Sequence, residues 1–178
     1  MNWTIEALRN YRKTEACYGE QEDYCRRFEV IAENPDYFLR TTPTAHFTAS
    51  AVLLSPDKRK ALFTLHRKLN RWLQLGGHAD GETNLSLTAL REAQEESGIL
   101  QIELLSHEAI DLDIHWIPQG KEPGHFHYDM RFLLWSPTAD LPKCSEESHA
   151  LEWFSLEHPF EEPSLTRLLM KAKGLLSR

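Results

Sequence analysis

Apolar residues in the first 40 positions recur with the spacing of two amphipathic helices. The first stripe comprises Trp3, Ala7, Leu8 and Tyr11, and the second comprises Tyr24, Cys25, Phe28, Ile31 and Ala32. Both stripes repeat every three to four residues, as one face of a helix does, and Pro35 ends the second helix. Neither helix can bury its own stripe. We therefore expect both helices to cover the rest of the same chain, with a second subunit as the alternative partner.

From Thr44 the pattern changes to short apolar and β-branched runs separated by turn-forming segments. These runs predict strands at residues 46–55, 61–67, 71–75, 100–106, 108–117, 125–135 and 151–156. The Gly-rich segment 76–84 is typical of a loop, and residues 85–97 are typical of a helix that ends at Gly98. A last helix is expected to begin at Pro163.

This order of elements defines the expected fold class. Strands on both sides of one central helix, followed by a terminal helix, predict an α+β fold with a mixed β-sheet between helices, an α/β/α sandwich. The composition of the chain changes near Pro43, with no linker at that point. We therefore expect an N-terminal helical extension at residues 1–43 and a main domain at residues 44–178.

Composition and charge restrict the class of protein further. A chain of 178 residues with 41% hydrophobic and 26% charged residues has the size and composition of one soluble domain. The formal net charge of −7 disfavours nonspecific nucleic-acid binding. The cysteines Cys17, Cys25 and Cys144 are too few and too far apart for a disulfide framework. Because no apolar leader or membrane-length apolar run is present, we expect a cytoplasmic protein with no membrane partner.

The most distinctive local feature is the sequence REAQEE at residues 91–96, in the predicted central helix. At about 100° per residue, Glu92, Glu95 and Glu96 fall within an arc of roughly 100°. Carboxylates one turn apart repel one another, so a compensating cation is expected. That cation is either Arg91 or a divalent ion such as Mg²⁺, which prefers oxygen ligands. A solvent-exposed acidic face is the alternative interpretation.

The Gly-rich segment GGHADG, residues 76–81, lies directly before this helix. Glycine permits positive φ and a close approach of the backbone to a bound ion or phosphate. A strand, a Gly-rich loop, a carboxylate-bearing helix and a glycine cap follow one another within about 25 residues. Together they form one compact unit that is able to build a site.

Residues 76–99, GGHADGETNLSLTALREAQEESGI, resemble the Nudix box, G-x5-E-x7-R-E-U-x-E-E-x-G-U, in which U is aliphatic. The residues that match at the required spacings are Gly77, Arg91, Glu92, Ala93, Glu95, Glu96, Gly98 and Ile99. By this resemblance the chain is similar, over roughly residues 44–175, to the MutT-like Nudix hydrolases. The GGHADG form with a later HxHxD strand resembles a bacterial subgroup of undefined substrate.

Two positions depart from the family pattern. The first box glutamate falls at Thr83, with Glu82 beside it. In the family this glutamate helps to position the box arginine, so either Glu82 replaces it after a small loop shift or the role is weakened. Leu75 stands where many relatives have proline, which concerns the rigidity of the loop and not the chemistry.

The resemblance implies a Nudix fold and an enzyme that uses Mg²⁺ or Mn²⁺. Such an enzyme cleaves a nucleoside diphosphate linked to another moiety, or a related organic diphosphate, by attack of metal-activated water on phosphorus. The implied metal ligands are Glu92, Glu95, Glu96 and the Gly77 carbonyl. Glu92 is either a further ligand or the residue that helps to deprotonate water, and Arg91 orients the carboxylates. The implied catalytic residues are therefore Glu92, Glu95 and Arg91, with a small-molecule diphosphate as the partner.

A second group of polar residues lies outside the box. Alternation along the strand at 125–135 places on one face His125, His127, Asp129 and Arg131. These are candidate substrate contacts, because Arg131 is able to pair with phosphate and Asp129 to act on metal or water. A solvated sheet face is the alternative. The HxH pair also suits zinc, although the sequence reveals no further ligand for it.

Two other functions share the same fold. Isopentenyl-diphosphate isomerases use a Gly-His near His78 as a metal ligand, but they place a catalytic cysteine where this chain has Leu75 and Gly76. They also lack an intact box. The other alternative is a catalytically idle Nudix-fold nucleotide sensor. Such sensors usually lose box glutamates, whereas all three helix glutamates are present in this chain.

Overall fold

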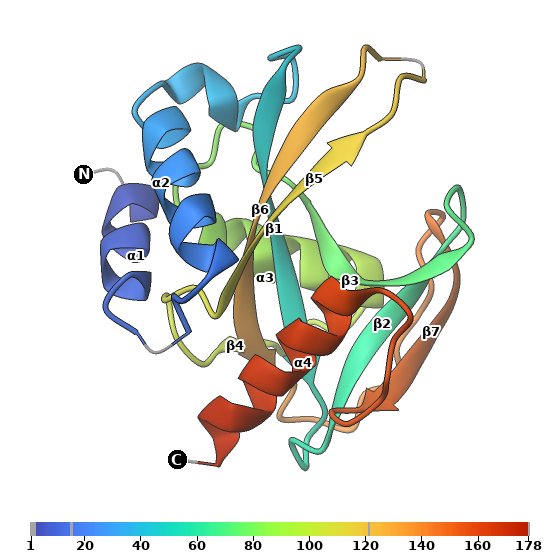
Figure 1. The fold of residues 1–178 in the computed structure, drawn as a ribbon. Helices are drawn as coiled ribbons and strands as arrows, with labels where there is room; N and C mark the ends of the chain where they lie inside the picture. Colours follow the sequence, from blue (N-terminus) through green and yellow to red (C-terminus); the bar gives the residue numbers. More distant parts are fainter. Residues whose placement is uncertain (1–2, 15, 121, 178) are drawn as a thin grey trace.

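The computed structural model describes residues 3–14, 16–120 and 122–177, which form a mixed β-sheet with helices packed on it (Figure 1). The α-helices are α1 (Trp3–Tyr11), α2 (Glu20–Ala32), α3 (Leu85–Ser97) and α4 (Pro163–Leu176), and a 3₁₀ helix spans Pro35–Phe38. The strands are β1 (Ala45–Leu54), β2 (Lys60–His66), β3 (Arg71–His78), β4 (Glu103–Leu104), β5 (Asp111–Ile117), β6 (His125–Trp135) and β7 (Ser148–Ser155). Within these described ranges, no helix combines the length and the hydropathy needed to cross a membrane.

Strand β1 lies at the centre of the sheet because it has partners on both sides. The strand order is β4-β6-β1-β3-β2-β7, and β5 also pairs with β6. Strand β1 runs parallel to β6, while the other pairings are antiparallel. The parallel register places side by side the pairs His46–His127, Thr48–Asp129 and Ser50–Arg131. Polar residues of two strands that are distant in the sequence therefore meet on one face of the sheet.

The two faces of the sheet are covered by different helices. One face is apolar and packs against α1, α2 and α3 in a cluster that includes Phe28, Phe47, Ala89, Ala93, Tyr128 and Met130. The other face is apolar at one end, where α4 packs on Val52, Leu54 and Leu133. The rest of this second face is polar. Figure 1 shows α3 and α4 on opposite sides of the sheet, which confirms the predicted arrangement of a mixed sheet between helices.

The N-terminal helices belong to the same hydrophobic core as the sheet. Their fully buried apolar residues are Leu8, Tyr11, Cys25 and Phe28. The Phe28 ring lies 5.8 Å from the Phe47 ring and 5.2 Å from the Tyr128 ring. The Gln21 side chain donates to Leu112 O at 2.9 Å and accepts from Leu112 N at 3.0 Å, so it pairs with strand β5 at its free edge. Both stripes pack on the same chain as predicted, except for Trp3, which is 49% exposed.

The predicted elements are present, and the differences concern the ends of strands. Helix 85–97 and strand 125–135 have the predicted bounds. Strand β3 continues through Gly76, Gly77 and His78, for which the sequence indicates a loop, because these residues pair with β1. The strand predicted at 100–106 is reduced to β4, since it pairs only with the last two residues of β6.

Candidate active site

Helix α3 presents its carboxylates beside the end of β3. Its apolar side includes Ala89 and Ala93, which are fully buried against the sheet. The helix ends at Gly98, whose left-handed conformation (φ 69°, ψ 5°) lets its N–H donate back to the last turn. Because small alanines separate the helix from the sheet, the side chains of Glu92 and Glu96 reach the backbone of β3.

Glu96 is the most buried carboxylate of the helix, with 7% of its surface exposed. Its Oε2 accepts a hydrogen bond of 2.9 Å from the backbone N–H of Gly76. Burial raises the pKa of Glu96 to about 7, although the Gly76 bond lowers it, and the charge of Glu92 raises it further. A bound cation at this position would favour the ionised form of Glu96.

Glu92 lies directly against Gly77. A Cβ atom at Gly77 would lie 2.4–2.6 Å from the carboxylate atoms of Glu92, so any larger residue would displace that carboxylate. The Glu92 side chain is 14% exposed, and burial raises its pKa. Glycine at this position thus allows the backbone of β3 and a carboxylate of α3 to approach each other closely.

Arg91 joins the helix carboxylates to the strand. Its Nη1 lies 2.7 Å from Glu92 Oε1 and 3.3 Å from Glu95 Oε2, and its Nη2 donates to His78 O at 2.9 Å. Glu95 is the exposed member of the group, with 60% of its side chain accessible. The Glu82 carboxylate instead accepts from a backbone N–H of its own loop at 2.6 Å. This geometry does not support the interpretation that Glu82 replaces the missing box glutamate.

Without divalent cations, Glu96 is expected to make the free energy of unfolding fall as the pH rises from about 4.5 to about 7. The native side chain holds its proton up to about pH 7, whereas the unfolded one titrates at the ordinary pKa of 4.5. Ionisation in this window therefore favours the unfolded state, by on the order of 3 kcal/mol in total. The free energy of unfolding is measured with urea in the presence of a chelator, from about pH 4 to 8, for the unaltered protein and for Glu96→Gln. Parallel pH profiles of the two proteins would contradict this expectation.

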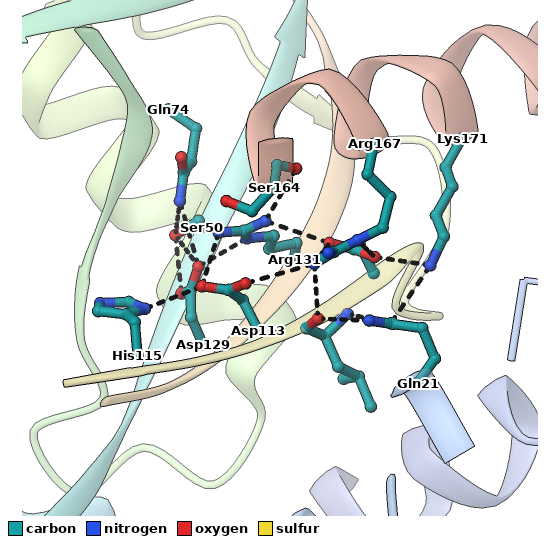
Figure 2. A network of polar contacts seen from close by, with 12 residues as sticks. Gln21, Ser50, Gln74, Asp113, His115, Asp129, Arg131, Ser164, Arg167 and Lys171 are labelled. Carbon is teal, nitrogen blue, oxygen red and sulfur yellow. Dashed lines mark hydrogen bonds and ion pairs between the residues drawn. The ribbon is translucent and has the colours of Figure 1, made fainter. Parts of the chain in front are cut away.

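The polar part of the second sheet face contains a buried charge network centred on Arg131 (Figure 2). The Arg131 side chain is 3% exposed and lies 3.0 Å from Asp129, 3.1 Å from Asp111 and 3.1 Å from Asp113. Burial alone would lower the pKa of Arg131, but the three carboxylates raise it above its ordinary value. The charged guanidinium is therefore committed to internal ion pairs.

Asp129 is also surrounded by partners inside the fold. It accepts hydrogen bonds from Thr48 at 3.0 Å, Ser50 at 2.7 Å, Gln74 at 3.2 Å and Arg131 at 3.0 Å. Only 1% of the Asp129 surface is exposed. Asp129 and Arg131 are thus paired inside the fold, and their predicted role as substrate contacts stays a prediction.

Two basic residues of α4, Arg167 and Lys171, extend this network to the N-terminal helices (Figure 2). Arg167 lies 3.1 Å from Asp111 and 2.7 Å from Glu20, and Lys171 lies 2.6 Å from Asp111 and 2.8 Å from the Tyr11 hydroxyl. Asp111 thereby joins β5, α4 and the helical extension. Sequence reasoning missed Arg167 and Lys171, because they lie 56 and 60 residues from Asp111.

The other end of the polar face holds a group of imidazole rings, in which His115 of β5 also lies 5.3 Å from His127. His46 of β1 and His78 of β3 lie beside His125 and His127 of β6, with ring centroids of neighbours 4.6–5.2 Å apart. Burial lowers the pKa of His78 to about 4 and of His127 to about 2, so both rings are neutral at pH 7. The sequence indicates the HxH pair but not His46, which reaches it only through the parallel register of β1 and β6.

The N-terminal segment also contacts the loop between β3 and α3. Three hydrogen-bonded contacts join them: Thr4 Oγ1 to Thr83 O at 2.7 Å, Gly81 N to Phe38 O at 2.8 Å, and Arg40 Nε to Asp80 Oδ1 at 2.6 Å. The loop leads directly into the carboxylate helix. The N-terminal segment therefore helps to position the strand end and helix that carry the candidate site.

Comparison with known protein families gives a match over most of the chain. The model of the NUDIX domain matches residues 44–171, a range that contains the sheet, α3 and most of α4. This match confirms the resemblance found in residues 76–99 and leaves α1 and α2 outside it. The comparison with curated proteins found no match.

Solved structures of this fold are similar over most of their length. A NUDIX-family hydrolase from Clostridium perfringens is 28% identical, has a TM-score of 0.53, and aligns over 73% of this chain and 97% of its own. The Ap4A hydrolase of C. elegans in a binary complex is 19% identical, with a TM-score of 0.56, and aligns over 74% of this chain and 97% of its own. The MutT protein of Methanosarcina mazei Go1 is 15% identical, with a TM-score of 0.55, and aligns over 77% of this chain and 99% of its own. The chain therefore belongs to the NUDIX domain family and is a Nudix hydrolase.

Proposed function

We propose that the protein is a Mg²⁺- or Mn²⁺-dependent diphosphohydrolase. Its substrate is a nucleoside diphosphate linked to another moiety, or a related organic diphosphate. The observation that carries this proposal is the position of two glutamates of α3 at the end of β3. The carboxylate of Glu96 is buried and accepts a hydrogen bond from Gly76 N, and the carboxylate of Glu92 lies against Gly77. Carboxylate oxygens, two sets of which lie at this strand end, are ligands that Mg²⁺ and Mn²⁺ prefer.

The charge of this group also fits a divalent cation. The three carboxylates of α3 and the guanidinium of Arg91 leave two negative charges when all four groups are ionised. Burial raises the pKa of both Glu92 and Glu96, so their ionised forms are costly without a nearby cation. The proposed ligands are Glu92, Glu95, Glu96 and the Gly77 carbonyl. When bound, the ion lowers the pKa of water and neutralises charge on phosphate oxygens.

The residues of the chain supply the remaining chemistry. Glu92, whose pKa is raised by burial, is suited to accept a proton from the water that attacks phosphorus. Arg91 holds the carboxylates of Glu92 and Glu95 in fixed directions through charge-assisted hydrogen bonds. Its contact with His78 O keeps this pair close to the end of β3.

A panel of organic diphosphates tests this proposal. The protein is incubated with dinucleoside polyphosphates, nucleoside diphosphate sugars, nucleoside triphosphates and isopentenyl diphosphate, each with Mg²⁺, Mn²⁺ or a chelator. Release of a monophosphate or phosphate product that requires the metal supports a diphosphohydrolase. Binding without turnover would indicate a nucleotide sensor. Conversion of isopentenyl diphosphate to its isomer without phosphate release would indicate an isomerase.

Mg²⁺ is expected to raise the melting temperature, since an ion that binds only the native state stabilises it. At a concentration of 100 times Kd the gain is about 2.7 kcal/mol. The Glu95→Gln/Glu96→Gln variant should lose this shift, whereas Glu152→Gln, at an exposed position of β7, should retain it. An equal shift in the protein and in the double variant would place the ion elsewhere.

A further inference from the structure

Four of the histidines at the end of the polar sheet face, His46, His78, His125 and His127, have the placement of a metal site. His46, His125 and His127 each offer one ring nitrogen, and these atoms all lie within 4.8 Å of one another. The ring of His78 lies 5.0 Å from that of His46 and 5.2 Å from that of His127. The four residues belong to the adjacent strands β1, β3 and β6, so the sheet itself fixes their relative positions.

Backbone carbonyls orient two of these rings. His125 Nδ1 lies 2.8 Å from Pro123 O, and His46 Nδ1 lies 3.4 Å from Thr42 O. A carbonyl oxygen accepts only from a protonated nitrogen, so in the neutral form both rings carry their hydrogen on Nδ1 and the lone pair on Nε2. A carbonyl on the second ring nitrogen is the usual support of a metal-binding histidine.

One pair of these nitrogens already has the separation that a shared ion requires, and the third lies within 4.8 Å of both. His125 Nε2 and His127 Nε2 are 3.2 Å apart. Two nitrogen ligands of a tetrahedral zinc ion, each about 2.0–2.1 Å from the metal, are about 3.3–3.4 Å apart. A hydrogen bond between the two imidazoles would account for this pair alone, but not for His46.

The Nε2 of His46 is buried and has no hydrogen-bond partner among the residues that the structure describes. His46 as a whole is 1% exposed. A buried polar atom without a partner costs free energy, and such atoms are rare in native proteins. An ion between His46 and the His125–His127 pair would satisfy this nitrogen, while the pair would give up a single hydrogen bond.

We propose that His46, His125 and His127 bind a first-row transition-metal ion of the Zn²⁺ class, with His78 or water as the fourth ligand. Imidazole nitrogen favours ions such as zinc, cobalt, nickel and iron, whereas Mg²⁺ takes oxygen ligands. The site is therefore chemically distinct from the carboxylates of α3. This assignment replaces the substrate contacts that the sequence predicts for His125 and His127.

The histidine site and the carboxylates lie on opposite sides of β3. Successive strand residues face opposite sides of a sheet, and Gly77 faces Glu92 whereas the ring of His78 lies beside that of His46. The carbonyl of His78 also accepts from Arg91 at 2.9 Å. With His78 as the fourth ligand, the ion would also hold the strand end that carries Gly77, a structural role that does not depend on substrate.

Titration with Co²⁺ tests this site without an activity assay. The full chain is stripped of metal with a chelator and transferred to excess Mg²⁺, which saturates the carboxylates of α3. Co²⁺ held tetrahedrally by imidazoles absorbs visible light strongly and so reports occupancy. We expect saturation at one equivalent per chain, with displacement by Zn²⁺ and not by further Mg²⁺.

Variants locate the bound ion. His46→Ala and His127→Gln should each weaken Co²⁺ binding by at least the roughly 10–100-fold that loss of a supporting residue costs. His149→Ala, at an exposed position, and Glu95→Gln/Glu96→Gln should bind Co²⁺ as the unaltered protein does. If His46→Ala fails to fold, the less buried His127→Gln decides the question. The proposal is overturned if the unaltered protein lacks the one-equivalent site, or if the glutamate variant loses it while the histidine variants keep it.

Discussion

Replacing Glu96 by glutamine is expected to lower kcat for a diphosphate substrate by about 10²–10³-fold or more, with the protein still folded. Glutamine keeps the shape of the side chain and can still accept the hydrogen bond from Gly76 N. It removes the negative charge that we propose to bind the divalent cation. Because Glu96 is buried and its pKa is raised, the neutral amide should not destabilise the metal-free protein.

The matched measurements use other glutamates of the chain. Glu95→Gln should also lose activity, since it removes a second proposed ligand, while Glu152→Gln on exposed β7 should leave kcat unchanged. Circular dichroism and thermal unfolding verify that each variant is folded. If Glu95→Gln and Glu96→Gln both retain near-normal kcat at saturating Mg²⁺, the carboxylates of α3 form only a solvated acidic face.

Substitution of Arg131 by methionine is expected to lower the free energy of unfolding by about 3–5 kcal/mol. Methionine approximates the length of the arginine side chain but leaves Asp111, Asp113 and Asp129 without the guanidinium that contacts all three. Arg167 and Lys171 still pair with Asp111, so the loss of the guanidinium affects Asp129 most. Urea unfolding at neutral pH measures the change.

An exposed ion pair provides the control for this effect. Arg26 lies 3.7 Å from Asp23 on the surface of α2, with 63% and 58% of the two side chains exposed. Arg26→Met should therefore change the free energy of unfolding by only about 0–1 kcal/mol. A loss in Arg131→Met no larger than that in Arg26→Met would contradict a stabilising role for the buried network.

The elements that could be predicted from the sequence are those with strong local periodicity. Helix α3 and strand β6 have the predicted bounds, because apolar spacing and the Gly98 cap are local signals. The end of β3 could not be predicted in this way. Gly76, Gly77 and His78 are typical loop residues, and only their pairing with β1 residues 26–30 positions earlier places them in the sheet.

The residues of the candidate site likewise include some that local sequence predicts and some that it does not. The carboxylates of α3 and Gly77 lie within one short stretch of sequence, so their spacing alone indicates their common role. Alternation also places His125, His127, Asp129 and Arg131 correctly on one face of β6. It does not show that carboxylates of β5 pair with Arg131 and in turn with Arg167 of α4, or that His46 joins His125 and His127, because such contacts depend on sheet register and helix packing.

Hydrolysis in water enriched in heavy oxygen tests most directly whether this Nudix hydrolase directs water at phosphorus. A diphosphate that the protein turns over is incubated in labelled water with Mg²⁺ or Mn²⁺, and the products are analysed by mass spectrometry. We predict one labelled oxygen in a phosphate group of the products, formed only with the divalent cation and lost in Glu95→Gln/Glu96→Gln. Cleavage that leaves the phosphate groups unlabelled, or labelling that persists with a chelator and in the double variant, would contradict this function.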